Sequence, residues 1–501
     1  MKKFSKILFV GLLTVVMGCN DAIDIRQPGR LDAQNAFRSV EDLRLGLLAV
    51  YNQWDLTPEI GLSANFTDEI SIGFDSGGQG VATYNFVVNA AATVARDFWV
   101  RNFRVNNRAT LLIEAAALIT PEAGEEDLYN NVLAQTYAIR AYANLELLTY
   151  FSSDPTDDTT LAAPVVDFVA PLDYQPLRNT TGEMWAYIND DLATALSLSN
   201  EQSNATFIST DAINAMRARA ALTRQDYGTV QTLASQLLSA YPLANTAQYA
   251  AMWLDNDNTE VIFKLERAVN DGYDGQSNTD NDSGLALGGG WAGSQFAFVD
   301  ATLAGSPYFE MDRGVFNLLD TDDVRFDVIV APTSVINPNY DTDPDPVNTD
   351  ILVIQKYPGS EGRPLMNDLK VFRSSEMLLM LAEARVATNN DLSGAANLIK
   401  QLRDARFGSA QPTPMYGSAQ EAYAAILDER RIELAYEGHR YKDLKRLGVA
   451  ANRGVSRDNV DCSAQGAPCS LPASDFRFSL PIPIVEINGN PGISSQQNPG
   501  Y

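Results

Sequence analysis

Several aromatic side chains lie in stretches of sequence that favour loops over helices or strands. Trp291 follows three glycines in GGGWAG, and Tyr273 lies in NDGYDG. Phe74, Tyr84 and Asn85 lie in a second stretch that is rich in Gly, Asn and Thr. A sugar presents apolar C–H faces ringed by hydroxyl groups, so aromatic rings can cover the faces while Asn, Asp and Arg bind the hydroxyls. We therefore predict that these five residues bind a sugar. The alternative for each ring is packing against the scaffold.

Side chains that usually perform catalysis are scarce. The one histidine, His439, lies in a stretch predicted to be helical, where a surface or core position explains it best. No G-x-S-x-G motif occurs, and Gly288-Gly289-Gly290 lacks the Lys-Ser/Thr pair of a Walker loop. A glycosidase needs two carboxyl groups about 5–10 Å apart, and 63 acidic residues leave that arrangement open. We predict that the protein is not an enzyme, with a surface glycosidase as the alternative.

One segment partly resembles a calcium loop. It has the sequence Asp280-Asn281-Asp282-Ser283-Gly284. In a calcium loop the glycine comes one place later, and a glutamate further along the chain completes the ligand set. Because both features are missing, we predict no bound metal at this segment, with calcium as the alternative. We also predict no cofactor.

The three cysteines have two different roles in our interpretation. Cys462 and Cys469 lie in NVDCSAQGAPCSLP, a loop-like stretch with Gly and Pro. In a secreted chain this spacing predicts a small disulfide loop. A metal pair is the alternative, but two thiols without a nearby His or further Cys make a poor zinc site. Cys19 belongs to the N-terminal segment.

The N-terminus has the pattern of a lipoprotein signal. Three lysines precede an apolar run, Ile7 to Met17, that is too short to span a bilayer, which needs roughly 20 helical residues. The run ends in Val-Met-Gly-Cys, which resembles a lipobox. We predict that residues 1–18 are a signal peptide, that Cys19 is lipidated and that residues 19–38 form a lipidated tether. Ordinary signal cleavage nearby is the alternative.

Composition excludes some classes of partner. The chain has 501 residues, is 45% hydrophobic and carries a formal net charge of −26. Such a chain can bury a large core, so it is not a disordered protein. Nucleic-acid binding needs a basic surface, so we predict no nucleic-acid partner. Length alone allows about three domains, yet we expect one integrated domain because similar helical patterns recur in both halves.

A row of carboxylates predicts buried ion pairs. Glu429, Glu433 and Glu437 recur every four residues in Ala424 to Gly448, a stretch without proline that we predict to be one long helix. Unpaired carboxylates at this spacing repel one another, so we expect cations opposite them. The alternative is a solvated face. The candidate partners are Arg373, Arg385, Arg403, Arg406, Arg430, Arg431 and Arg440.

Helical patterns recur through the chain on both sides of a loop-rich middle. The middle region, 251–368, and the stretch 57–92 are predicted to be loops with a few short strands, and the chain after Phe476 is predicted to be extended. The helix pair 211–224 and 228–241 resembles a tetratricopeptide unit of about 34 residues. The other predicted helices are 40–54, 93–119, 125–151, 181–198, 370–388 and 393–406.

Three motifs together resemble the SusD/RagB family of surface glycan-binding lipoproteins of Bacteroidota. The first is the segment from Ile426 to Gly448, with Glu429-Arg430 and Glu433-Leu434. The second runs from Val371-Phe372-Arg373 to Ala382-Glu383-Ala384. The third is the C-terminus, from Leu480-Pro481-Ile482-Pro483 to Asn498-Pro499-Gly500-Tyr501.

The resemblance implies a mainly α fold. Tetratricopeptide-like helix pairs would form a superhelical scaffold with a loop-rich ligand-binding region. Residues 39–501 would be the SusD-like domain, with scaffold helices in about 39–250 and 369–448. The ligand region would comprise about 57–92 and 251–368, which contain the five predicted sugar-binding residues.

The resemblance also implies a function and a location. Such a protein would capture an oligosaccharide or polysaccharide and deliver it to a SusC-like TonB-dependent outer-membrane transporter, without catalysis. It would be lipid-anchored to the outer membrane and face the cell exterior, as the acidic residues after Cys19 suggest for this family. The alternatives are a surface glycoside hydrolase, a peptide-binding member of the same uptake system, and a repeat protein used only for assembly.

Overall fold

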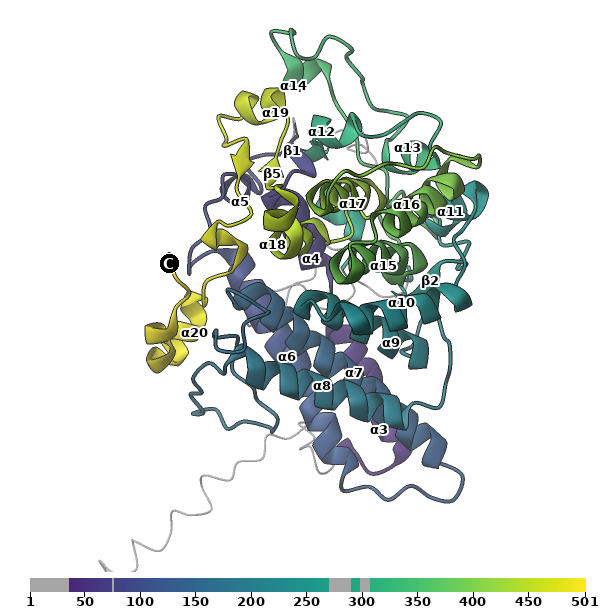
Figure 1. The fold of residues 1–501 in the computed structure, drawn as a ribbon. Coiled ribbons are helices and arrows are strands. Elements are labelled where there is room, and N and C mark those ends of the chain that lie inside the picture. The colour runs from purple at the N-terminus through teal and green to yellow at the C-terminus, as the bar shows by residue number, and fades with distance from the viewer. Residues whose placement is uncertain (1–35, 74–75, 270–289, 298–306) are drawn as a thin grey trace, which may run out of the picture.

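The computed structural model describes residues 36–73, 76–269, 290–297 and 307–501. Helices dominate it, with a few short strands, so the prediction of a mainly α fold is confirmed (Figure 1).

Helices of the first half form one packed group. α7 contacts α3, α6 and α8, and α9 packs against α10. Two helices begin at side-chain caps: the Ser39 side chain accepts a hydrogen bond from the Asp42 amide, and Thr180 forms a capping box with Glu183. The group comprises α3 (Val40–Gln53), α6 (Thr93–Ala116), α7 (Glu126–Phe151), α8 (Thr181–Leu198), α9 (Thr210–Arg224) and α10 (Tyr227–Ala240).

A second group of helices follows the loop-rich middle of the chain. α15 packs against α16 and α17, and its contact with α10 joins the two groups. The bounds of the first group and of α15 and α16 agree closely with the predicted helices, whereas α11 was not predicted. The second group comprises α11 (Thr246–Met252), α15 (Ser374–Asn389), α16 (Leu392–Phe407), α17 (Ala419–Glu433) and α18 (Arg440–Ala451).

The predicted single helix from Ala424 to Gly448 is two helices, so that prediction is wrong. α17 ends at Glu433 and α18 begins at Arg440. In the connection, Tyr436 and Gly438 have φ values of 63° and 85°, a left-handed conformation that ends an α-helix. A Cβ at Gly438 would also make a tight contact, 3.2 Å from the Glu59 Cβ.

The stretch 57–92 also differs from its prediction as mostly loop. It contains α4 (Thr57–Phe66), β1 (Ile70–Ile72) and α5 (Val81–Tyr84). α4 has Pro in its first turn, where the missing N–H costs nothing. Nearly every α4 residue is buried. A helix buried on all sides has no apolar stripe, so the 3.6-residue pattern that marks surface helices is absent.

In the described part of the middle region, 251–269, 290–297 and 307–368, the elements are short. β1 pairs antiparallel with β3, and β2 pairs antiparallel with β4. The elements are β2 (Val261–Leu265), η1 (Ala292–Gln295), β3 (Phe309–Met311), α12 (Arg313–Phe316), α13 (Val324–Ile329), α14 (Pro346–Thr349) and β4 (Leu369–Arg373).

The C-terminal segment is less extended than predicted. Pro483 is the N-cap of a short helix, a position that a proline tolerates. The segment contains β5 (Val455–Ser456), which pairs with β6 (Ser470–Leu471), and also α19 (Asn459–Ala464), η2 (Phe476–Phe478), α20 (Ile484–Gly489) and η3 (Pro491–Gln496).

Buried apolar side chains connect the two groups of helices. The larger cluster of described core residues extends along the chain from Leu43 to Ile493. Trp54, directly after α3, stacks on Phe263 of β2 with ring centroids 5.7 Å apart, and it meets Tyr142 of α7 edge-on. In the described part of the chain, every helix is too short or too polar to span a bilayer.

Candidate functional site

Two loop segments that are distant in sequence pack against α4. Gly61 of α4 leaves the space that the Gln295 side chain of η1 fills, because a Cβ at Gly61 would overlap it. On the other segment, Asn65 Nδ2 donates to the Gly80 carbonyl at 3.1 Å. Gly80 has a φ of 70° and lies against the Phe309 ring. We name the described residues 76–88, 290–297 and 307–311 the loop region. It brings together parts of both predicted ligand stretches.

Trp291 directly precedes η1 as its N-cap residue, and its side chain is covered. The residue is only 4% exposed, and its carbonyl accepts hydrogen bonds from the Ser294 amide and hydroxyl at 3.2 and 2.6 Å. Gly293, two residues on, lies against Leu365, so η1 is enclosed between α4 and the 365 segment. The flat face that we expected to be open is therefore buried here, and sugar binding by Trp291 stays a prediction. Among the described residues, its indole N–H has no hydrogen-bond partner.

Tyr84 is buried as well. It has no exposed surface, and the guanidinium carbon of Arg457 lies 3.7 Å from the centre of its ring. We expected this ring to be open to solvent, but Arg457, which lies more than 370 positions away in the sequence, covers it. Asn85 ends α5 and is half-buried, so it has surface that a ligand could reach. The predicted residues Phe74 and Tyr273 lie outside the described residues.

The chain after α4 is attached by buried polar contacts to the segment Ile426–Gly448, which we name the hallmark segment. Arg440 donates to both carboxylate oxygens of Asp68, at 2.8 and 3.0 Å. Burial alone would raise the pKa of Asp68, but Arg431 and Arg440 lower it to about 2. These cations hold the carboxylate ionised.

The neighbouring carboxyl group behaves in the opposite way. Glu69 is fully buried, and burial raises its pKa to about 7. Its Oε1 accepts the Tyr436 amide at 2.9 Å, which opposes the rise only partly. Tyr436 is the residue with left-handed backbone between α17 and α18. Glu69, which directly precedes β1, therefore binds the turn between α17 and α18.

The row of glutamates meets buried cations, as predicted. Glu433 has no exposed surface and lies 2.9 Å from Arg406 and 3.0 Å from Arg373. Burial favours the neutral carboxyl group, yet Arg406, Arg373 and Arg325 together lower the pKa of Glu433 strongly. The solvated-face alternative is thereby excluded for this residue.

The cations that pair with the three glutamates differ in part from the predicted arginines. Arg403 pairs with Glu429 at 2.8 Å, as expected. The other predicted arginines serve other acids: Arg430 pairs with Asp443, Arg431 with Asp312, Arg440 with Asp68 and the exposed Arg385 with Asp391.

Two cations that pair with these glutamates were not predicted from the sequence. Arg325 contacts Glu429 at 2.7 Å, and Lys356 contacts Glu437 at 2.6 Å. Both cations come from the loop-rich middle, where no periodic pattern marks a position as buried. The burial of a lysine or arginine in this region therefore cannot be predicted from a single sequence.

His439 is buried rather than placed for acid–base chemistry. It is 7% exposed, and burial, with the nearby cations Arg219 and Lys442, holds its pKa well below the usual range. It is therefore neutral near pH 7. Within the described ranges, no group of three or more His, Cys, Asp or Glu residues is placed to hold a metal ion.

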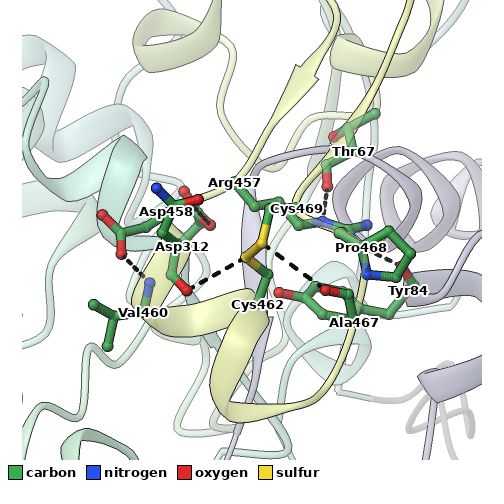
Figure 2. The surroundings of a disulfide bond; sticks show 11 residues. Thr67, Tyr84, Asp312, Arg457, Asp458, Val460, Cys462, Ala467, Pro468 and Cys469 are labelled. Carbon is green, nitrogen blue, oxygen red and sulfur yellow. Dashed lines mark hydrogen bonds between the residues drawn. A yellow bond between two sulfur atoms is a disulfide. The ribbon is translucent and has the colours of Figure 1, made fainter.

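Cys462 and Cys469 form a disulfide in the structure, with Cα atoms 5.3 Å apart (Figure 2). Cys462 belongs to α19, and Cys469 directly precedes β6. Figure 2 shows Arg457 next to this bridge, between the cysteine loop and Tyr84 and Thr67. The bridge therefore lies beside the loop region, although it is distant from it in sequence.

Comparisons with known proteins agree with this architecture. A family model described as the SusD family matches residues 339–501. The SusD-like protein P2 of Formosa agariphila is 25% identical over an alignment that covers 100% of both chains. A SusD superfamily protein from Bacteroides thetaiotaomicron has a structure similar to this one, with a TM-score of 0.75 at 21% identity, covering 92% of this chain and 100% of that chain. Surface glycan-binding protein A from Bacteroides fluxus gives 0.68 at 20% identity, covering 92% and 99%. The fold is shared with both structures.

Proposed function

Because this chain belongs to the SusD/RagB family, we propose that it is a lipid-anchored surface protein that binds a glycan without cleaving it and delivers it to a SusC-like TonB-dependent transporter. The observation that carries this proposal is the end-to-end similarity to a SusD-like protein. A structural relative that is named a surface glycan-binding protein supports the choice of ligand class.

The loop region is the proposed place of glycan binding. It lies on α4, where two segments from different parts of the chain meet, and it offers half-buried Asn85 and the exposed Gln79. Amide groups of this kind donate to and accept from sugar hydroxyls.

An exposed apolar patch suits a protein partner. The segment 168–177 contacts α20 and the residue that follows it. Gln175 Nε2 donates to the Gly489 carbonyl at 3.1 Å, and Asn490 Nδ2 donates to the Pro176 carbonyl at 2.6 Å. Together they expose Phe168, Val169, Leu172, Tyr174, Leu177, Ile484 and Val485. Exposed apolar groups gathered in this way mark interaction sites, and we propose this patch as the contact with the transporter.

A polysaccharide array with a parallel assay for released sugars tests the function. We expect the protein to retain at least one polysaccharide and to release no product from it. Release of product would indicate the glycoside hydrolase, and retention of peptides alone would indicate a peptide-binding member of the same system.

Co-purification from membranes tests the partner. The parent protein is expected to bring a TonB-dependent barrel with it, and Leu172→Asp should weaken that association by placing a charge in the apolar patch. Met415→Asp is the matched control, because Met415 is also exposed but lies in the loop between α16 and α17. Equal recovery with both variants would remove the patch from the interface.

A further inference from the structure

Arg457 caps the end of α4 although it comes from the C-terminal part of the chain. Its Nε donates to the Thr67 carbonyl at 2.8 Å, and its Nη2 donates to the carbonyls of Asn65 and Phe66 at 3.2 Å each. The last carbonyls of a helix lack partners within the helix, and a cation there also interacts favourably with the helix dipole. Arg457 is only 4% exposed. The hydrogen bonds of its guanidinium group go to main-chain carbonyls.

The same guanidinium group holds one segment of the loop region. Its Nη1 donates to the Tyr84 carbonyl at 2.6 Å, and its carbon lies over the rings of Tyr84 and Phe86, at 3.7 and 4.4 Å from their centres. Phe86 has a φ of 58°, an uncommon backbone conformation for a large side chain. The contact with Arg457 therefore stabilises a turn that a chain would not favour alone.

The disulfide loop holds Arg457 in turn. The Arg457 amide donates to the Cys469 carbonyl at 2.9 Å, and Nη1 also donates to the Pro468 carbonyl at 3.1 Å. The Cys462–Cys469 bridge joins this segment to α19 (Figure 2). The main chain and the side chain of Arg457 are thus both attached to residues directly beside the bridge.

We propose that Arg457 is a positioning residue for the loop region, held by the Cys462–Cys469 disulfide, and that the two together fix the Tyr84–Phe86 segment against the end of α4. The positioning rests on geometry alone, whereas its relevance to glycan binding rests on the function proposed above. In this arrangement the disulfide serves the proposed ligand site although neither cysteine belongs to it.

Hydrogen exchange of the mature, full-length protein tests the positioning without any ligand. The amides of Tyr84, Asn85, Phe86 and Val87 donate hydrogen bonds within this segment, so they report on its order. We expect Arg457→Met and the double variant Cys462→Ser/Cys469→Ser to accelerate their exchange at least tenfold, with α7 amides unchanged. Arg457→Lys should be intermediate, because it keeps the charge but loses the planar group.

Controls separate positioning from general destabilisation. Arg453→Met is the matched control, because Arg453 is exposed and pairs with Asp428 on the surface. It should leave exchange at residues 84–87 unchanged. Unchanged exchange in the Arg457→Met and double-serine variants would overturn the proposal, and so would equal acceleration in α7.

Binding to the polysaccharide array then tests the link to the ligand. We expect the double-serine variant to bind the polysaccharides that the parent retains at least fivefold more weakly. Unchanged affinity alongside faster local exchange would overturn the link to the ligand site. If the parent retains no polysaccharide, the proposed function fails, whereas the exchange result still decides the positioning.

Discussion

Arg406 of α16 and Glu433 of α17 face each other with no exposed surface, their Nη2 and Oε1 atoms 2.9 Å apart. Arg406 Nη2 also lies 2.7 Å from Glu260, and Arg373 reaches Glu433 from the end of β4. One carboxylate therefore connects two scaffold helices to the strand that follows the loop-rich middle. A buried charge of this kind is stable only while its partners are present.

Replacing Glu433 with Ala should destabilise the fold strongly. The change leaves Arg406 and Arg373 buried with less compensation, and breaking a buried pair typically costs about 3–5 kcal/mol. Chemical denaturation measures the loss. The matched control is Arg385→Ala, because the Arg385–Asp391 pair is exposed and should cost less than about 1 kcal/mol. Equal midpoints for the two variants would show that the buried pairs do not stabilise the fold.

Only some of the cations that pair with these glutamates could be predicted from the sequence. The four-residue spacing of the glutamates correctly predicted buried cations, and Arg373, Arg403 and Arg406 lie on elements with clear helical or strand patterns. Arg325 and Lys356 could not be found, since they approach from a region without periodicity.

The candidate site was harder to predict than the scaffold. α4 was missed because a helix buried on every side has no polar face. Tyr84 and Trp291 were expected to be open because their neighbours in sequence are small or polar. Their burial comes from contacts across the chain, with Arg457 against Tyr84 and with Leu365 near η1.

Glu69 should make stability depend on pH. Burial raises its pKa in the folded state to about 7, whereas an unfolded glutamate titrates near 4.3. The folded state therefore holds the proton more tightly, so the stabilisation is fully present below about pH 4.3 and declines until pH passes about 7. Glu69→Gln mimics the protonated form and removes this decline.

The difference in melting temperature, variant minus parent, isolates Glu69 from other titrating groups. We expect this difference to grow between about pH 4.3 and 7 and to level off above it. At about 1.4 kcal/mol per pKa unit, the shift corresponds to about 4 kcal/mol in the free energy of unfolding. Asp312, whose pKa burial also raises to about 7, titrates in both proteins and largely cancels. A difference that is constant over this pH range would contradict the assignment.

Cys19→Ala should prevent anchoring. Lipidation requires the thiol, and the acyl chains contribute about 0.8 kcal/mol for each buried CH₂ group. The variant is expected in the soluble fraction or with its signal still attached, while the parent is labelled by radioactive fatty acid in the membrane. Met17→Leu is the control that keeps the cysteine and the apolar run. Fatty-acid labelling of the Cys19→Ala variant would refute the lipobox.

The Trp291→Ala variant distinguishes a packing role of the ring from a ligand-binding role, because the two roles predict different changes in melting temperature and affinity. A ring that is 4% exposed contributes to packing, so Trp291→Ala should lower the free energy of unfolding by about 3–5 kcal/mol. Tyr174→Ala is the control, an exposed ring whose loss should leave the melting curve nearly unchanged. If the melting temperature of Trp291→Ala stays at that of the parent while the affinity for the retained polysaccharide falls by about 1–3 kcal/mol, the indole is a ligand platform after all. A lowered melting temperature with unchanged affinity would assign the ring to the packing of η1 on α4, and glycan binding would then be sought first at Asn85.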